Sequence, residues 1–304
     1  MIIDYYYFIL AGLLVGFCVG VTGVGGGSLM TPILISVMGV PPQIAIGTDL
    51  LYASISKFCG SLVHAKKLNI VWPIVIFLSL GSIPASLGTT WALHYFFESS
   101  NDYKKLLTMV LGFMLVLTGI SIVFRAQIEQ FFAKRRGMTT EQRHSLHADS
   151  PEAQNIQAQA MLKNKGLVVF MGAVLGVFVT LSSVGAGAFG IMALVLLFPN
   201  LPMIRIIGSD VVHAVLLTLV AGLGHLFTGN VDFTMLGYLL IGAIPAIIVG
   251  TLVSSKLPEH HIRRVLGVTL LLIGINFMVN PIKAKAAPTT PPPAAIIHNP
   301  KVVS

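Results

Sequence analysis

Long apolar segments constrain the fold of this chain more than any other feature of its sequence. Only 10% of its 304 residues are charged, whereas about 25% is usual for a soluble domain. The apolar residues are concentrated in runs close to the ~20 residues that a helix needs to cross the hydrocarbon core of a bilayer. Such runs are Tyr5–Val21, Ile70–Phe97, Leu106–Phe124, Leu167–Leu181 and Phe233–Ser255. The sequence therefore predicts an all-α polytopic membrane protein, because a β-barrel would show short alternating segments instead.

The net charge of +8 does not indicate a nucleic-acid partner. The basic residues lie in loops and in one polar segment rather than on one helix face, and positive loops in a membrane protein are topology signals. Cys18 and Cys59 both lie in apolar runs, so no disulfide framework is expected. The first residues, Met1 to Asp4, contain no basic group, so we expect the first helix to be retained rather than cleaved as a signal peptide.

The second half of the chain repeats the first half. Small, proline and polar residues recur at an offset of 160 or 161 positions, which slips to 155 near the end. The matching groups are Gly25-Gly26-Gly27 with Gly185-Ala186-Gly187, Gly47-Thr48-Asp49 with Gly208-Ser209-Asp210, His64 with His225, Asn69 with Asn230, Pro84 with Pro245, Gly112 with Gly267, and Gly119 with Gly274. Each half contains about five apolar segments, some of them the length of half-helices. The sequence therefore predicts two pseudo-symmetric membrane repeats.

Composition divides the chain into four parts. Residues 1–124 form the first membrane repeat and residues 166–281 the second. Between them, residues 125–165 carry seven Lys or Arg and four Asp or Glu, which predicts a cytoplasmic polar linker. Residues 282–304 are rich in proline, which predicts a disordered C-terminal tail.

The number of crossings in each half decides how the repeats are related. An odd number gives equivalent helices opposite orientations, which is the inverted repeat of many secondary transporters. With an outside N-terminus, the linker and most basic loops fall inside, as the positive-inside rule requires, although Lys104 and Lys105 do not. If one short segment is re-entrant by itself, the repeats become parallel. The sequence favours the inverted arrangement and leaves the number of spans between eight and ten.

Glycine-rich breaks at corresponding places in the two halves predict a substrate site. Short half-helices at such breaks present unpaired N–H groups and positive dipole ends, which suit an oxyanion. Neighbouring Ser and Thr residues add hydroxyl donors, with Thr31, Thr180 and Ser182 as further examples. The alternative is that these small residues serve close helix packing. The predicted substrate-binding residues are Thr22, Gly25, Gly26, Gly27, Ser28, Thr48, Ser183, Gly185, Gly187 and Ser209.

Four ionisable residues lie within apolar runs, where each is costly unless it is paired or hydrated. They are Asp49, Lys57, Asp210 and His213. We predict that they set coupling and charge balance. Each has a second interpretation. The two carboxylates could cap their helices, and His213 could make a structural hydrogen bond. Lys57 could extend toward the membrane surface instead of meeting the substrate or a carboxylate of the other half.

Motifs for common enzyme classes are missing from the sequence. There is no Walker A motif, no His-Glu-x-x-His and no cysteine cluster. Ser182 and Ser183 lack a Gly-x-Ser-x-Gly setting, although a Ser/His dyad with His213 or His225 stays open. We therefore expect no catalytic residue, no cofactor and no metal site.

The motifs of the first half resemble those of a known family. Gly23-Val-Gly-Gly-Gly-Ser with Pro32, Ala45-Ile-Gly-Thr48, and His64 with Asn69, echoed more weakly in the second half, are similar to the sulfite exporter TauE/SafE family. The resemblance covers most of residues 5–280, apart from the linker. It implies an integral membrane permease that moves sulfite, sulfoacetate or other sulfur-containing organic anions.

The hypothesis that best accounts for these features is a secondary transporter for a small anion, working by alternating access in the plasma (inner) membrane. Its partners would be the anion, a coupling proton or cation, and membrane lipid. One alternative is a membrane sensor or scaffold whose linker binds a cytoplasmic partner, and another is an intramembrane hydrolase. Substrate identity, transport direction, coupling ion and oligomeric state are not specified by the sequence.

Overall fold

A computed structural model describes residues 2–22, 27–66, 70–96, 101–124, 127, 151–198, 201, 203–253 and 259–281 of the chain. These residues form ten α-helices and no β-strand. The helices are α1 (Ile2–Thr22), α2 (Gly27–Ser36), α3 (Pro42–Lys66), α4 (Trp72–Phe96), α5 (Asn101–Val123), α8 (Pro151–Ser182), α9 (Ala188–Leu197), α10 (Met203–Phe227), α11 (Phe233–Val253) and α12 (Glu259–Val279).

Local sequence explains several of the helix ends. Proline at a first helical position has no N–H to leave unpaired, and α3 begins with Pro42. The side chain of Asp232 accepts a hydrogen bond from the backbone N–H of Met235 (2.9 Å), which caps the start of α11. The half-helices α2 and α9 each follow a glycine-rich break and are ten residues long.

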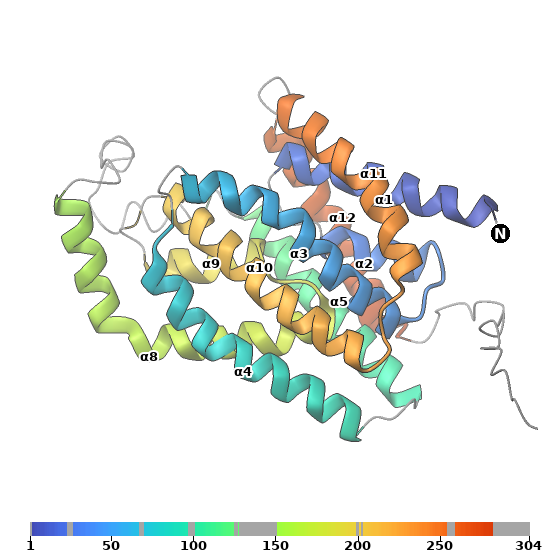
Figure 1. The fold of residues 1–304 in the computed structure, drawn as a ribbon, viewed down its shortest axis with the longest axis horizontal. Helices are drawn as coiled ribbons and strands as arrows, with labels where there is room; N and C mark the ends of the chain where they lie inside the picture. Colours follow the sequence, from blue (N-terminus) through green and yellow to red (C-terminus); the bar gives the residue numbers. More distant parts are fainter. Residues whose placement is uncertain are drawn as a thin grey trace, which may run out of the picture.

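The long helices α3 and α10 lie side by side in the middle of the molecule (Figure 1). The pair α4 and α8 packs on one side of them, and the pair α1 and α11 lies on the other side. Buried apolar residues form two clusters. One includes Leu78, Leu175 and Leu217 from α4, α8 and α10, and the other includes Val15 and Leu239 from α1 and α11.

Equivalent helices of the two halves pack antiparallel where they meet. Early α3 contacts late α10, since Gly47 lies against Asn230 just after α10. Further along α3, Ser54 Oγ donates to the carbonyl of Val215 (3.3 Å), which is its own equivalent in the repeat. The helices α5 and α12 also pack antiparallel, with Gly112 against Gly274 and Gly119 against Gly267. The contacts between the halves therefore pair α3 with α10 and α5 with α12 in opposite directions.

The outer pairs of helices touch backbone to backbone through glycine. A Cβ atom at Gly81 of α4 would overlap the carbonyl oxygen of Val169 in α8, whereas Gly88 on the same helix has open space. We expect Gly81→Val to lower the free energy of unfolding by about 1–3 kcal/mol, because overpacking forces the helices apart. Gly88→Val is the matched control. Unfolding of both variants in detergent checks this, and equal midpoints would contradict it.

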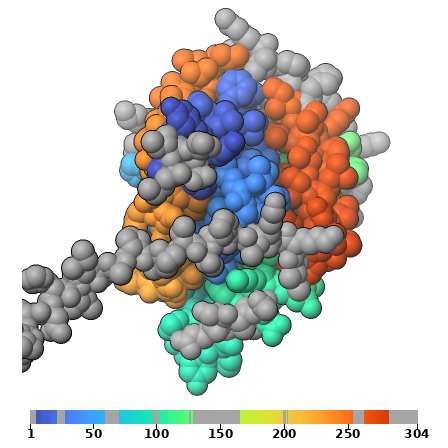
Figure 2. Space-filling view, turned by 90° about the vertical axis from the view of Figure 1, so that its right-hand side faces the viewer, coloured from blue at the N-terminus to red at the C-terminus, as the bar shows by residue number. Residues whose placement is uncertain are grey.

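Six helices in the described part of the chain are long and apolar enough to cross a membrane. They are Trp72–Phe96, Asp102–Val123, Lys165–Ser182, Met203–Phe227, Phe233–Val253 and Ile262–Val279. Large apolar side chains are exposed on the outer surface, including Leu10 (61%), Trp91 (65%) and Leu252 (72%), as a lipid-facing surface requires. Figure 2 shows first-half residues in blue between orange residues of α10 and α11 and red residues of α12. The protein is a multi-pass membrane protein.

The apolar segments predicted from the sequence correspond to helices. Proline is accommodated inside α4 at Pro84 and inside α11 at Pro245. One boundary differs: α8 begins at Pro151, within the segment predicted as a polar linker, and runs on into the membrane helix. Residues 128–150 of that segment and the tail 282–304 lie outside the described residues. The division into four parts stays a prediction.

Candidate functional site

The break between α8 and α9 is built on unusual backbone geometry. Gly185 and Gly187 have φ angles of 113° and 141°, which only glycine adopts at low cost. Ser183, which directly follows α8, has φ 59° although it carries a side chain. Strain at a buried non-glycine residue is often retained for function. The break brings Ser183 and the first turn of α9 toward the centre of the protein, where α3 and α10 pass.

Asp49 of α3 lies beside the half-helix α2. It is fully buried, and its Oδ2 accepts a hydrogen bond from the Thr31 hydroxyl of α2. The hydroxyl of Ser183 also interacts with this carboxylate, but it does not form a hydrogen bond of good geometry. As a result Asp49 Oδ1 and Ser183 Oγ are both buried without a hydrogen-bond partner among the described residues. Such unsatisfied groups are costly in a protein interior.

Asp210 of α10 lies beside the other half-helix, α9. Its Oδ1 is so close to Gly190, in the first turn of α9, that a Cβ atom at Gly190 would overlap it. Its Oδ2 is buried and has no hydrogen-bond partner among the described residues. A carboxylate at this place interacts favourably with the positive end of the helix dipole. The two halves of the chain therefore each place one carboxylate beside one half-helix, Asp210 at the first turn of α9 and Asp49 at Thr31, in the second turn of α2.

Lys57 connects the two halves of this site. Its Nζ donates a hydrogen bond to the carbonyl of Ala186, in the break before α9. It also interacts electrostatically with both carboxylates, most strongly with Asp210 and then with Asp49. Lys57 is half-buried. Lys57 therefore contacts the backbone of the other half rather than extending toward the membrane surface.

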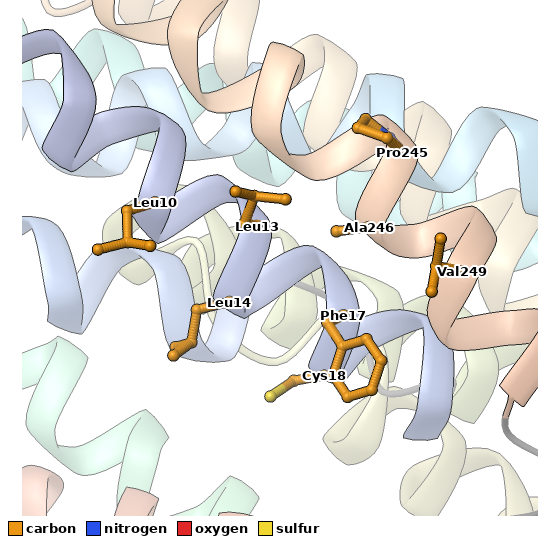
Figure 3. Close-up of a pocket in the computed structure, with 8 residues that line it drawn as sticks. All are labelled: Leu10, Leu13, Leu14, Phe17, Cys18, Pro245, Ala246 and Val249. Carbon is orange, nitrogen blue, oxygen red and sulfur yellow. The ribbon is translucent and has the colours of Figure 1, made fainter.

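Some cavities lined by the described residues lie outside this cluster. One of about 520 Å³ lies between α1 and α11 and is lined by apolar side chains such as Leu10, Phe17 and Val249, together with Cys18 (Figure 3). Leu10 and Val249 are exposed on the apolar outer surface, so this groove does not suit a small anion. A cavity of about 140 Å³ at the end of α2 is partly polar, and its lining includes Ser36, Thr108, Asn276 and Asn280.

Residues 8–277 match the model of the family described as sulfite exporter TauE/SafE. The chain belongs to this family. The family membership accounts for the membrane architecture and makes the protein a membrane transporter.

Curated relatives of this TauE/SafE protein are named as transporters. The probable membrane transporter protein YjnA of Bacillus subtilis is 32% identical over 270 residues, which cover 89% of this chain and 98% of the relative. A probable membrane transporter protein of Xylella fastidiosa is 28% identical over 87% of this chain and 91% of its own length. A third, from Methanocaldococcus jannaschii, is 24% identical over 89% of this chain and 94% of its own length. No solved structure matches the chain significantly.

The structure places the predicted site residues of this TauE/SafE protein in three groups. Asp49, Lys57, Asp210 and Ser183 come together, with the backbone of Gly185 to Gly187 beside them. The hydroxyls of Thr48 and Ser209 instead accept hydrogen bonds from the backbone N–H groups of Asp232 (3.0 Å) and Val71 (2.8 Å), which start α11 and α4 in the opposite half.

The remaining predicted residues include several near the first glycine break. Ser28 is buried in the first turn of α2. Gly25 and Gly26 lie outside the described residues. Only the helical backbone is described for Thr22, which ends α1, and for Gly27, which begins α2.

His213 is one turn from Asp210, and its Nε2 pairs with Ser82 Oγ of α4 (2.9 Å).

Two contributors of the site were not predicted from the sequence. Gly190 has no side chain and so leaves space for the carboxylate of Asp210. The carbonyl of Ala186 accepts a hydrogen bond from the ammonium group of Lys57. Gly190 continues the spacing Gly185-x-Gly187-x-x-Gly190, but the equivalent position in the first half is Met30, so comparison of the halves did not select it. A backbone carbonyl has no sequence signature at all.

Proposed function

We propose that this TauE/SafE protein is a secondary transporter for a small anion and that the anion binds between the first turns of α2 and α9. The observation that carries the proposal is the grouping of Asp49, Lys57 and Asp210 beside two half-helices, with Asp49 against Thr31 of α2 and Asp210 against the first turn of α9. Intramembrane ionisable residues that line a break between half-helices are typical of substrate and coupling sites.

The charges of the cluster support proton-coupled binding of an anion. With both carboxylates ionised, two negative charges interact with one ammonium group, and Asp210 occupies the positive end of α9. When the carboxylates take up protons, Lys57 and the helix N–H groups become free to hold an incoming anion. Asp49 Oδ1 and Asp210 Oδ2, which have no hydrogen-bond partner among the described residues, are the atoms available to take those protons.

Sulfite or an organosulfonate is the substrate that we propose. The family is described as sulfite exporters, and a sulfonate or sulfite group offers three oxygen acceptors to donors that converge from several directions. In this cluster the donors are Lys57, the Ser183 hydroxyl and the first N–H groups of α2 and α9. We also propose that the protein acts in the plasma membrane.

Alternating access by two inverted repeats is the mechanism that fits this site. A two-fold axis along the membrane normal would make equivalent helices run in the same direction, whereas an axis in the membrane plane reverses them. The antiparallel packing of α3 with α10 and of α5 with α12 supports the second case. On this arrangement the hydrogen bonds of Thr48 and Ser209 to the opposite half lie on opposite sides of the membrane, and we propose a structural role for both.

Flux through the purified full-length protein tests the proposed function. Proteoliposomes are loaded with buffer, and uptake of ³⁵S-labelled sulfite and of a labelled organosulfonate is followed against protein-free vesicles. We expect saturable, protein-dependent flux of at least one of these anions. If neither shows it, the proposed function is refuted.

Asp49→Asn is expected to remove the pH dependence of this flux. An amide is neutral at every pH and cannot release the proton that the carboxylate exchanges. The matched control is Asp102→Asn, since Asp102 is exposed in the first turn of α5 and should leave the pH profile unchanged. Flux measured at several pH values checks both variants, and an unchanged profile in Asp49→Asn would rule out this coupling role.

A further inference from the structure

One threonine of α5 differs from other buried threonines of this protein. A threonine hydroxyl inside a helix can donate to the carbonyl four residues before it. Thr108 of the same helix does so (2.8 Å), and so do Thr180 of α8 and Thr218 of α10 (2.7 Å each). Thr118 is fully buried, but its hydroxyl has no hydrogen-bond partner among the described residues. A buried hydroxyl without a partner is costly, so the Thr118 side chain is placed for a partner that these residues do not supply.

The neighbours of Thr118 on α5 show which part of the protein it faces. Met114, one turn before it, lies so close to Gly185 that a Cβ atom at Gly185 would overlap the Met114 methyl group. Ser121, one turn after it, donates to the carbonyl of Ala188, the first residue of α9 (3.1 Å). Residues at this spacing project from one face of a helix. Thr118 therefore lies opposite the middle of the break between α8 and α9.

The same break is reached by groups of the candidate site from two other helices. Lys57 of α3 donates to the carbonyl of Ala186, in the middle of the break. Asp210 of α10 lies against Gly190, in the first turn of α9. The helices α3, α5 and α10 thus enclose the break from different directions. Thr118 is on the wall that α5 contributes.

Helix packing alone does not require a hydroxyl at this position. The repeat that aligns Gly119 with Gly274 places Ile273 of α12 where Thr118 stands. Ile273 is partly buried and packs against an apolar cluster. An apolar side chain therefore meets the packing demand at the equivalent place in the other half. The Thr118 hydroxyl adds a hydrogen-bond donor that packing does not need.

We propose that Thr118 is a further substrate-binding residue, whose hydroxyl donates a hydrogen bond to an oxygen of the transported anion. This inference rests on the proposed function and adds α5 to the binding site. A hydroxyl donor holds an anion without leaving a charge unpaired when the site is empty. Lys57, Ser183 and Thr118 approach from α3, from the break and from α5, which suits an anion with three oxygens. Such an anion pairs the Ser183 and Thr118 hydroxyls, which both lack a hydrogen-bond partner among the described residues.

Three variants of the full-length protein test this role. Thr118→Val removes the hydroxyl and keeps the shape of the side chain, and Thr118→Ser keeps the hydroxyl. Thr108→Val is the matched control, because it makes the same exchange at a buried position of α5 whose hydroxyl donates to the backbone of its own helix. Uptake of ³⁵S-sulfite, or of the organosulfonate that the wild type carries, is measured in proteoliposomes over a range of concentrations.

We expect Thr118→Val to raise the KM for the anion at least about tenfold, the loss typical of one hydrogen bond to a charged group. Thr118→Ser should recover most of the affinity, and Thr108→Val should leave KM unchanged. The proposal fails if Thr118→Val and Thr108→Val have the same KM, or if Thr118→Val lowers only the maximal flux.

Unfolding in detergent separates substrate binding from a structural role of Thr118. Thr118→Val removes a hydroxyl that has no partner among the described residues, so no donor or acceptor there is left without its hydrogen bond. We expect the unfolding midpoint of Thr118→Val to be no lower than that of the wild type. If the midpoint falls together with the affinity, Thr118 supports the fold and the proposal is refuted.

Cysteine labelling tests the α5 wall without transport. Thr118→Cys and the control Leu78→Cys, which is buried where α4 packs against α8, are made in a full-length chain with Cys18→Ser and Cys59→Ser. The probe is 2-sulfonatoethyl methanethiosulfonate, which carries a sulfonate; a thiolate attacks its thiol sulfur, forms a mixed disulfide and releases methanesulfinate.

We expect Thr118→Cys in proteoliposomes to be labelled and Leu78→Cys to stay unlabelled over the same time, since only an accessible thiol reacts. Equal labelling of the two variants overturns the assignment of Thr118 even if transport is confirmed. Labelling of Thr118→Cys alone, in a protein whose wild type shows no saturable flux, refutes the transport function and keeps Thr118 in a site that admits sulfonates.

Discussion

Lys57→Met is expected to abolish anion transport and to lower the free energy of unfolding by about 1–3 kcal/mol. The ammonium group donates to the carbonyl of Ala186, and a carbonyl that loses its donor in a protein interior costs about 1–3 kcal/mol. The lower end applies here, since Lys57 is half-buried. Without the ammonium group, Asp49 and Asp210 also lose a nearby positive charge that interacts with both. Flux assays and unfolding in detergent measure the two effects.

Two further variants show whether charge is the cause. Lys105→Met makes the same change at an exposed position of α5 and should alter neither property beyond about 0.5 kcal/mol. Lys57→Met combined with Asp210→Asn removes one negative charge together with the positive one, so we expect it to recover much of the lost stability but not the transport. Full transport by Lys57→Met would contradict the role of this residue.

Gly190→Ala is expected to reduce transport about 100-fold while the protein still folds. The new methyl group would occupy the place of Asp210 Oδ1 and push the carboxylate away from the first turn of α9. Displacement of a functional group by about 1 Å can cost ~10²-fold in activity. The flexible carboxylate can move aside, so the effect on stability should be much smaller than the effect on flux.

Gly237→Ala is the matched control for this substitution. Gly237 lies inside α11, and a Cβ atom there meets nothing within 4 Å. It makes the same chemical change in a helix of the same repeat and should leave flux and stability close to wild type. If both glycine variants transport equally well, the position of Asp210 against α9 is not important for function.

The fold of this protein could be predicted from its sequence to a large extent. Helix ends were signalled by glycine and proline, and the internal repeat matched α1–α5 with α8–α12 because related positions in the halves meet the same packing demands. The start of α8 could not be placed. Its first turns are polar, and a helix that continues out of the membrane has no apolar boundary there.

The candidate site could be predicted in part. Asp49, Asp210 and Lys57 stood out because ionisable residues in apolar runs need partners. The partners themselves depend on how the halves pack. The sequence does not reveal that Lys57 of the first half reaches Ala186 of the second.

Thr48 and Ser209 illustrate the same limit. Both hydroxyls are next to an intramembrane carboxylate in the sequence, which made them candidates for substrate binding. In the folded chain they bond the backbone at the starts of α11 and α4 in the opposite half. Neighbouring positions of a helix point about 100° apart, so adjacency to Asp49 or Asp210 does not place a side chain in the same site.

The most direct test of the central claim is an experimental structure of the protein with its transported anion bound. The account predicts density for the anion between the first turns of α2 and α9, within hydrogen-bond distance of Lys57 and Ser183. The same density should be missing when Lys57→Met is prepared identically. Density for the anion at any other place, with the cluster of Asp49, Lys57 and Asp210 empty, would contradict the account.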